Sequence, residues 1–345
     1  MQTLWSVLVA VSLLGCAGCG RISIGPISLE ETALRTDSAP LLVSAGDVLD
    51  VATDFGSIVV EIDAQSPPTV EAEVRASGAT KAEAEQVLSR FALETVRTGK
   101  TVKIRLAGPL PDVEAGGSKS KTSATASFVI KAPPRVEVVA KTGSGSIRID
   151  GPTAKVRAES GFGSVKAKGG RGAIHLKSGS GSVDATDCRG DDMVLESSFG
   201  SLTVKDGAGK LTVKTGSGSV TVEGWTGSVE GRSEFGSVRA DGVFDRVKVG
   251  AGSGGVDVRA GAGSKIENEW SLQSEFGSVK CRLPLDFDAE ITAETSFGSV
   301  RADHPGLPRE SKGSAKRYTG VLGKGGRPLT LKTGSGSITV SALDG

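Results

Sequence analysis

EVVAKTGSGSIRIDGPTAKVRAESGFGSVKA, residues 137–167, contains two copies of one short phrase, in which Ser or Phe is followed by Gly, Ser and an aliphatic residue. The phrase recurs almost to the end of the chain. Its central glycines are Gly145, Gly163, Gly181, Gly200, Gly218, Gly236, Gly254, Gly277, Gly298 and Gly336. Most intervals between them are 18 or 19 residues, two are 23 and 21, and the last is 38. A fixed period near 20 residues is typical of stacked structural repeats.

The apolar residues keep a constant position within each repeat. In the first copy Val138 and Ala140 precede Gly145 by seven and five residues, and Ile147 and Ile149 follow it by two and four. This alternation predicts β-strands with one buried face, and no helical period competes with it. The sequence therefore predicts an all-β parallel β-solenoid (β-helix) of about ten 18–20-residue coils, each rising ~4.8 Å. A small α+β segment near the N-terminus does not follow the repeat.

Each central glycine is interpreted as a structural corner. A sharp bend between strands needs a positive φ or leaves no room for a Cβ atom. The residue before the glycine alternates between Ser and Phe over seven coils, and we expect each ring to lie over a small neighbour and fill the corner. A 36-residue coil remains the alternative, although it would stack Phe on Phe and like charges on one another.

Polar residues of the repeat form two further columns. Residues four before the glycine alternate in charge, which predicts ion pairs between adjacent coils. They are Lys141, Glu159, Lys177, Glu196 and Lys214. Hydroxyl residues three before the glycine are expected to point inward and to hydrogen-bond along the stack. They are Thr142, Ser160, Ser178, Ser197, Thr215 and Ser233.

The first residues have the character of an export signal. Residues 4–14 are an apolar run, too short to span a bilayer, and it ends in LLGC at residues 13–16. This ending resembles a bacterial lipobox, with Cys16 as the lipidated residue and Cys19 as the alternative acceptor. Residues 1–5 carry no Lys or Arg, and an ordinary cleaved signal peptide is the other interpretation. Both place the mature protein outside the cytoplasm.

Four parts are predicted along the chain. Residues 1–15 form a lipoprotein signal peptide, and residues 16–40 form a tether. Residues 41–137 form an N-terminal β-rich segment with a first coil at residues 49–60. Residues 138–345 form the solenoid repeats. Within the third part, Thr80-Lys81-Ala82-Glu83 resembles a capping box that begins a helix, which we expect to cover one end of the solenoid.

Composition argues against several classes of function. Lys and Arg number 41 and Asp and Glu 40, whereas a nucleic-acid-binding protein normally has a basic excess. Gly250, Gly252 and Gly255 fit GxGxxG, but a strand follows them where a dinucleotide site needs a helix. The sequence therefore predicts no nucleic-acid partner and no cofactor. Cys188 and Cys281 fall about five coils apart, which predicts no disulfide between them.

One turn has an enzyme-like composition. Asp184, Asp187, Asp191 and Asp192 surround Arg189, and carboxylates beside an Arg on a β-helix are suited to Ca²⁺ and an acidic sugar. These four Asp residues are the weak metal candidates. The neighbouring turns are short and build no cleft, and two His residues give no Ser-His-Asp set. No catalytic residue is therefore assigned.

The chain resembles a known bacterial family in its repeated phrases. Pro133-Pro134 leads into the copy at residues 142–147, and Leu322-Gly323-Lys324-Gly325 precedes the last copy at residues 333–338. Over roughly residues 41–345 these features resemble the "putative adhesin" domain-of-unknown-function family, and more loosely the GIN-type adhesin-head family. The resemblance implies a β-solenoid exported to the envelope, without catalytic residues to carry over.

These observations favour a non-enzymatic, lipid-anchored cell-envelope protein with a binding, adhesion or scaffold surface. The expected location is the outer membrane, facing the periplasm or the cell surface. The expected partners are an envelope polysaccharide or protein, and the membrane through the N-terminal lipid. Two alternatives are a β-helix carbohydrate-active enzyme that uses the Asp184–Asp192 turn and a periplasmic module that senses envelope state.

Replacement of the lipidation cysteine tests the anchor. Cys16→Ala is expected to move the mature chain from the membrane fraction to the soluble fraction, because Cys16 is the expected attachment point of the acyl chains. Cell fractionation and immunoblotting measure this, with Cys19→Ala as the matched control. Membrane retention of the Cys16→Ala protein together with release of the Cys19→Ala protein would move the acceptor to Cys19.

Overall fold

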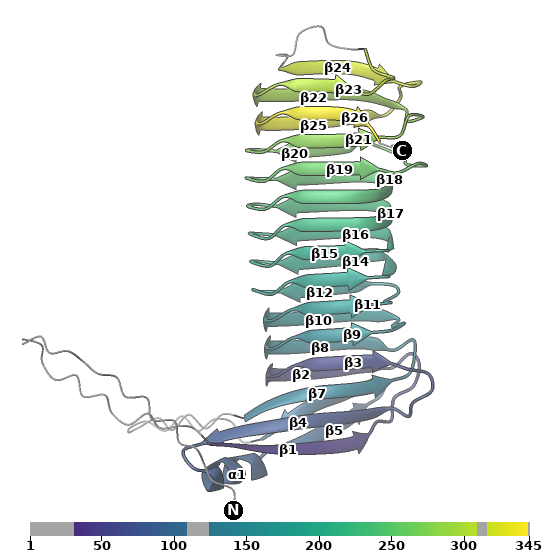
Figure 1. Ribbon diagram of the computed structural model, residues 1–345. Helices are drawn as coiled ribbons and strands as arrows, with labels where there is room; N and C mark the ends of the chain where they lie inside the picture. Colours follow the sequence, from purple (N-terminus) through teal and green to yellow (C-terminus); the bar gives the residue numbers. More distant parts are fainter. Residues whose placement is uncertain (1–30, 109–123, 309–315, 344–345) are drawn as a thin grey trace, which may run out of the picture.

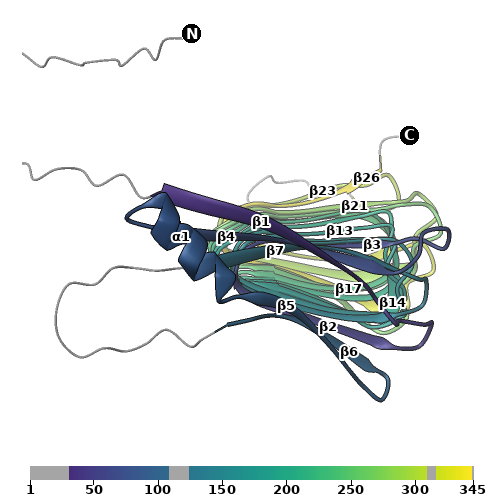
Figure 2. The same cartoon turned by 90° about the horizontal axis from the view of Figure 1, so that it is seen from below.

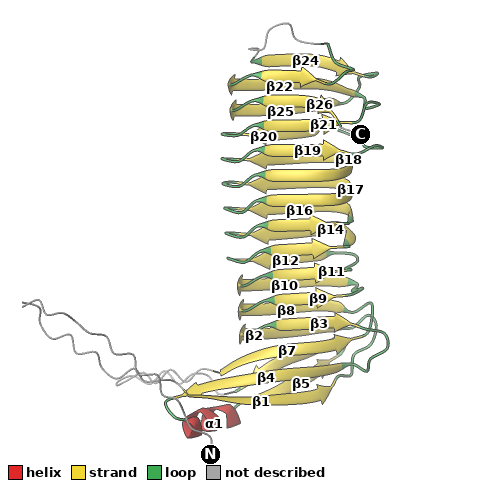
Figure 3. Cartoon of the chain, in the orientation of Figure 1, coloured by secondary structure: helices red, strands yellow, loops and turns green. Residues whose placement is uncertain are grey.

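The computed structural model describes residues 31–108, 124–308 and 316–343, and they form a long stack of strand layers (Figure 1). The described residues contain one helix and 26 strands, all in one hydrogen-bonded sheet (Figure 3). The all-β class is confirmed. The predicted signal peptide, Cys16 and Cys19 lie outside the described residues. Within the described ranges there is no helix long and apolar enough to cross a membrane.

The unit of the stack is a layer, which consists of one longer strand, a corner and one shorter strand. The described residues contain eleven layers, numbered here from the end that carries the helix. In that order they are β2 (Val48–Phe55) and β3 (Ile58–Ile62), β8 (Glu137–Ser144) and β9 (Ile147–Asp150), β10 (Lys155–Phe162) and β11 (Val165–Lys168), β12 (Ile174–Ser178) and β13 (Val183–Thr186), β14 (Arg189–Ser197) and β15 (Leu202–Lys205), β16 (Ala208–Thr215) with the start of β17 (Val220–Ser233), the end of β17 with the start of β18 (Val238–Ala251), the end of β18 with β19 (Val256–Ala260), β20 (Trp270–Ser274) and β21 (Val279–Leu283), β25 (Pro328–Ser335) and β26 (Ile338–Ala342), and β22 (Ala289–Phe297) and β23 (Val300–Asp303).

Adjacent layers pair in parallel, one repeat apart. Val156 of β10 pairs with Val138 of β8 on one side and with Ile174 of β12 on the other, 18 residues away in each case. The alternating aliphatic residues point between the two strand columns and are buried; Val138 and Ile147 have no exposed surface. The strands thus follow the 18-residue period and not its double.

The order of the layers departs from the order of the sequence at the C-terminal end. β25 pairs with β20 on one side and with β22 on the other, and β26 lies in the same way between β21 and β23. The chain therefore builds layer 11 first, turns back through β24 (Arg317–Leu322), which is antiparallel to β22, and then fills layer 10. The long interval before Gly336 contains this return.

The corners are tight because backbone approaches backbone there. A Cβ added to any of the ten central glycines would lie 1.9–2.4 Å from the carbonyl oxygen of the corner glycine in the preceding layer. For Gly200 that atom is the oxygen of Gly181, at 1.9 Å. No side chain fits at this distance, so close contact between layers requires glycine at the corner.

A buried hydroxyl reinforces nine of the ten repeat corners, the exception being the corner of Gly254, where Ala251 takes its place. Ser178 is fully buried, donates a 2.8 Å hydrogen bond to the carbonyl of Gly163 in the layer below, and accepts one from the N–H of Gly181 in its own layer. Equivalent bonds join hydroxyls to corner carbonyls from Thr142 to Thr333. The predicted inward hydroxyls are confirmed, and their partners are the glycine carbonyls.

The helix end of the stack is closed by antiparallel strands and α1 (Lys81–Ser89). β7 (Ala124–Ala132) pairs with β3, then β4 (Thr69–Gly78) and β1 (Glu31–Pro40) follow antiparallel. The hairpin of β5 (Ala92–Thr98) and β6 (Thr101–Ala107) extends the other column from β2. α1 packs on β1 and β4, and both lie across this end (Figure 2).

Two local expectations have opposite outcomes here. The predicted N-cap is present, because the Thr80 hydroxyl accepts from the N–H of Glu83 at 3.3 Å; the Glu83 carboxylate accepts from the N–H of Ala79, one residue before the N-cap, at 3.0 Å. The tether prediction is wrong for residues 31–40, which form β1. Its side chains are mostly polar and only Ala33 is buried, so pairing with the edge of β4 and not an apolar pattern fixes this strand.

A methyl group at a corner is expected to destabilise the stack. Gly200→Ala forces backbone apart and should cost about 3 kcal/mol, as severe overpacking does, and lower the Tm clearly. Gly250→Ala is the matched control, because its added Cβ meets only one backbone oxygen at 3.8 Å. Thermal unfolding followed by circular dichroism measures both; equal Tm values would contradict the role of the corners.

Candidate functional site

Six phenylalanines lie on the outside of the corner edge. Their exposed fractions are 54% for Phe55 and 68–74% for the other five. We call them the Phe column, which consists of Phe55, Phe162, Phe199, Phe235, Phe276 and Phe297. The expectation that these rings fill the corner is wrong. The buried hydroxyl bond and the glycine contact already occupy the inside of the corner, so the residue before the glycine turns outward.

The Phe column alternates with serine through all eleven layers. Phe55 pairs with Ser144, and Ser144 pairs with Phe162 on its other side. In sequence the alternation breaks at Phe276 and Phe297, but in space layer 10 places Ser335 between them. Neighbouring rings are therefore two layers apart, or ~9.6 Å at ~4.8 Å per layer.

The faces beside the Phe column carry ladders of ion pairs between adjacent layers. Lys141 pairs with Glu159 at 3.5 Å and Lys177 with Glu196 at 3.8 Å, which confirms the predicted charge column. On the other face, Lys166 lies 3.3 Å from Asp184. Such exposed pairs stabilise by only ~0.2–1 kcal/mol each. Their main effect is to keep both faces near neutral.

A small hollow of about 280 Å³ lies beside the Phe column in the upper layers. It forms where Gly250 has no side chain, next to Arg232 and Gln273 of the adjoining layers. Glu275 and Lys332 line its rim. The hollow is open and below the size range of most small-molecule sites.

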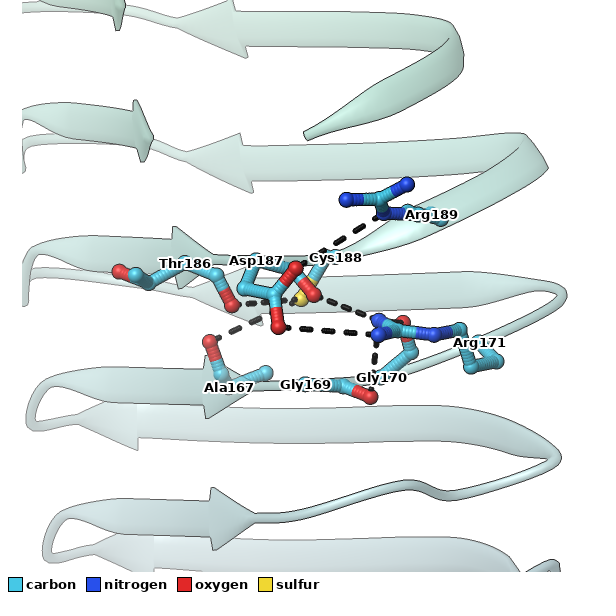
Figure 4. Close-up of polar contacts among 8 residues, drawn as sticks. All are labelled: Ala167, Gly169, Gly170, Arg171, Thr186, Asp187, Cys188 and Arg189. Carbon is cyan, nitrogen blue, oxygen red and sulfur yellow. Dashed lines mark hydrogen bonds and ion pairs between the residues drawn. The ribbon is translucent and has the colours of Figure 1, made fainter. Parts of the chain in front are cut away.

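The Asp-rich turn is an ion-paired clamp (Figure 4). Asp187 has a positive φ of 49°, and its carboxylate lies 3.6 Å from Arg171 and 3.8 Å from Arg189. Arg171 also donates hydrogen bonds to the backbone carbonyls of Asp187, Gly170 and Gly169, at 2.6, 3.0 and 3.1 Å. These contacts thus hold the turn at residues 187–189 against the turn at residues 169–171 in the adjacent layer.

The other candidate aspartates do not converge on this clamp. Asp184 is paired with Lys166, Asp192 lies 2.9 Å from Nε2 of His175, and Asp191 is exposed. The described residues contain no group of three His, Cys, Asp or Glu side chains that could hold a metal ion. The turn therefore has the geometry of a structural contact between layers.

Both described cysteines are buried and free. The Sγ of Cys188 lies beneath the clamp and donates to the carbonyls of Thr186 and Ala167, at 3.4 and 3.8 Å (Figure 4). Burial raises the pKa of its thiol, and burial raises the pKa of Cys281 to about 12. Both thiols stay protonated at neutral pH, so neither is a nucleophile. Cys188 directly precedes β14 in layer 5 and Cys281 lies in β21 of layer 9, so the two thiols are too far apart for a disulfide.

Comparison with known proteins gives a family and several remote structural likenesses. The family profile described as Toastrack DUF4097 matches residues 54–341. No curated protein matches. Solved structures described as "putative adhesin" include one from Parabacteroides distasonis, with 12% identity, TM-score 0.40 and coverage of 90% of this chain and 97% of that one. Another, from Bacteroides fragilis, has 10% identity, TM-score 0.34 and the same coverage. A P. distasonis structure described as "Putative lipid binding protein" has 12% identity, TM-score 0.35 and again the same coverage.

The ion-paired clamp predicts that Ca²⁺ does not stabilise the folded chain. Addition of Ca²⁺ to ~1 mM is expected to leave the Tm unchanged, because the arginines already neutralise Asp187 and an ion bound only to the native state would raise the Tm. Thermal unfolding with Ca²⁺ or with a chelator measures this. A rise in Tm that disappears in Asp187→Asn would show a calcium site and contradict the structural role.

Proposed function

The chain belongs to the Toastrack DUF4097 family, and from this premise we propose that it is an exported, non-enzymatic binding rod of the bacterial cell envelope. We further propose that its layers are the coils of a parallel β-solenoid, with residues 41–137 as the N-terminal segment and residues 138–345 as the repeats. Cys16 anchors the rod through lipid to the outer membrane. Its partner is an envelope polysaccharide or protein.

The Phe column is the observation that carries this proposal. Water-exposed rings cost free energy, and each of them lies at the same position of every second layer. Regular exposed apolar patches on a folded surface mark sites of interaction. The ion-pair ladders and the buried thiols, in contrast, are explained by the stability of the stack alone.

Over the part of the chain that the structure describes, the arrangement of the candidate side chains supports a binding role. The candidate carboxylates are dispersed or paired with basic side chains, and the hollow near Gly250 is open to water. Catalysis needs a convergent set of groups in a site that excludes water. A stiff surface with one repeated apolar feature is suited instead to holding a long partner at many points.

Removal of two central rings is expected to abolish partner binding. Phe199→Ser combined with Phe235→Ser restores at both positions the residue that alternate layers already carry, so the fold should persist. Capture of envelope components from a membrane extract by the tagged chain should fall by at least about tenfold.

Leu285→Ser is the matched control for this experiment, because Leu285 is 70% exposed but is not part of the Phe column. Its capture should equal that of the wild-type chain. Equal capture by the double Phe variant would move the binding surface away from the Phe column.

A further inference from the structure

We propose that the Phe column is a self-complementary interface, through which two copies of this chain pair side by side in antiparallel orientation. Each ring in the overlapping layers of one copy then lies over a serine layer of the other. The inference rests on the proposed function in taking the Phe column as the binding surface, and it names the partner as a second copy.

The period of the Phe column specifies this partner. Rings are two layers apart, and a serine layer lies between each two rings. The gap at each serine therefore extends one layer height, ~4.8 Å, to the ring above and to the ring below. A second copy has the same ~9.6 Å period along its whole length, because its layers are identical. Layers 1 and 11 both carry Phe, so full antiparallel overlap would set ring against ring. A shift by one layer instead sets ring against serine over ten layers.

A two-fold axis perpendicular to the stack generates this pairing. The axis makes the contact isologous, so the same edge serves both copies and the assembly closes at two. It also keeps the same charged face of both copies on the same side. The shifted register can leave either layer 1 or layer 11 unpaired, and the charges distinguish the two.

On the face of the longer strands, the charges beside the Phe column favour the register in which layer 1 is unpaired. Glu159 and Glu196 lie on ring layers, whereas Lys141, Lys177 and Lys214 lie on serine layers. Setting ring layers against serine layers therefore tends to bring opposite charges level with each other.

In this register, Lys141 is level with Glu294 of the second copy, and Glu159 is level with its Lys332. Like charges meet at Lys214 with Arg232, beside the axis, and at Arg148 with Arg301 on the face of the shorter strands. The chain as a whole has a formal charge of +1, so little net repulsion opposes pairing.

The area available matches that of a stable interface. A Phe side chain offers about 200 Å², and the five rings that are paired in this register, each 68–74% exposed, give on the order of 700 Å² per copy. Specific interfaces bury about 800 Å² per partner. The Phe column alone is therefore large enough for a dimer.

Antiparallel pairing has a consequence for adhesion. The N-terminal strands and α1 lie at the layer 1 end of the stack, so the two N-terminal ends of the pair lie at opposite ends of it (Figure 1). If each chain is anchored through Cys16, the pair joins two facing membranes. This gives homophilic adhesion between envelopes.

Sedimentation velocity of the full chain over about 1–100 µM tests the pairing. The wild-type chain is expected to form a dimer, and the Phe199→Ser, Phe235→Ser variant to raise its Kd by on the order of 100-fold. Ser217→Phe fills one gap, so it should also weaken the dimer by at least about tenfold although it adds apolar surface. Tighter association of this variant, or a wild-type chain that stays monomeric throughout, overturns the proposal.

Matched measurements keep the outcomes distinct. Leu285→Ser should dimerise like the wild type, and circular dichroism confirms the fold of each variant, with Ser253→Phe replacing Ser217→Phe if that chain does not fold. Flotation with phosphatidylethanolamine–phosphatidylglycerol vesicles tests a lipid surface as occupant instead. A monomeric wild-type chain whose capture of envelope components still needs the rings would overturn self-pairing and leave the proposed function standing.

Discussion

The approach of one corner glycine to the next is the constraint on which the stack depends. The carbonyl of each corner occupies the place where a Cβ of the following layer would lie, at 1.9–2.4 Å. This contact fixes the height and lateral position of every layer, and it allows parallel pairing to continue without a shift in register from Val138 through Val156 to Ile174. At Ser178 and the equivalent hydroxyl positions, the buried hydroxyl then uses the same carbonyl as its acceptor.

The same constraint decides what faces outward. Strict alternation along the strand would send the residue before the glycine inward, since the residues seven, five and three before it are all buried. The hydroxyl and the glycine backbone fill that space, and the chain bends so that Phe162 or Ser180 turns to solvent. The contacts inside the corner thereby place a row of side chains on the surface. The core does not constrain which residues these are.

The sequence predicts the buried interior of the stack better than its two ends and its exposed edge. The period, the buried columns, the corner glycines and the N-cap at Thr80 all follow from local patterns, because each depends on contacts within one repeat or between two. The direction of Phe199 depends on a bend that alternation alone does not reveal. The place of layer 10 depends on long-range pairing of β25 with two strands that are distant in sequence, and β1 is fixed by a neighbouring edge and not by its own apolar pattern.

The alternation of ring and serine is not something the fold requires. Aromatic rings pack favourably at centroid separations of 4.5–7 Å, so a Phe on every layer, ~4.8 Å apart, would form a continuous stack and shield its own surface from water. The chain instead keeps Ser144, Ser180 and Ser217 between rings, and it preserves the alternation even where the layers are out of sequence order. Spacing the rings leaves each of them more exposed and gives the stack no stability that a full column would lack. A regular feature that the folded chain alone does not need is best explained by what binds in the gaps.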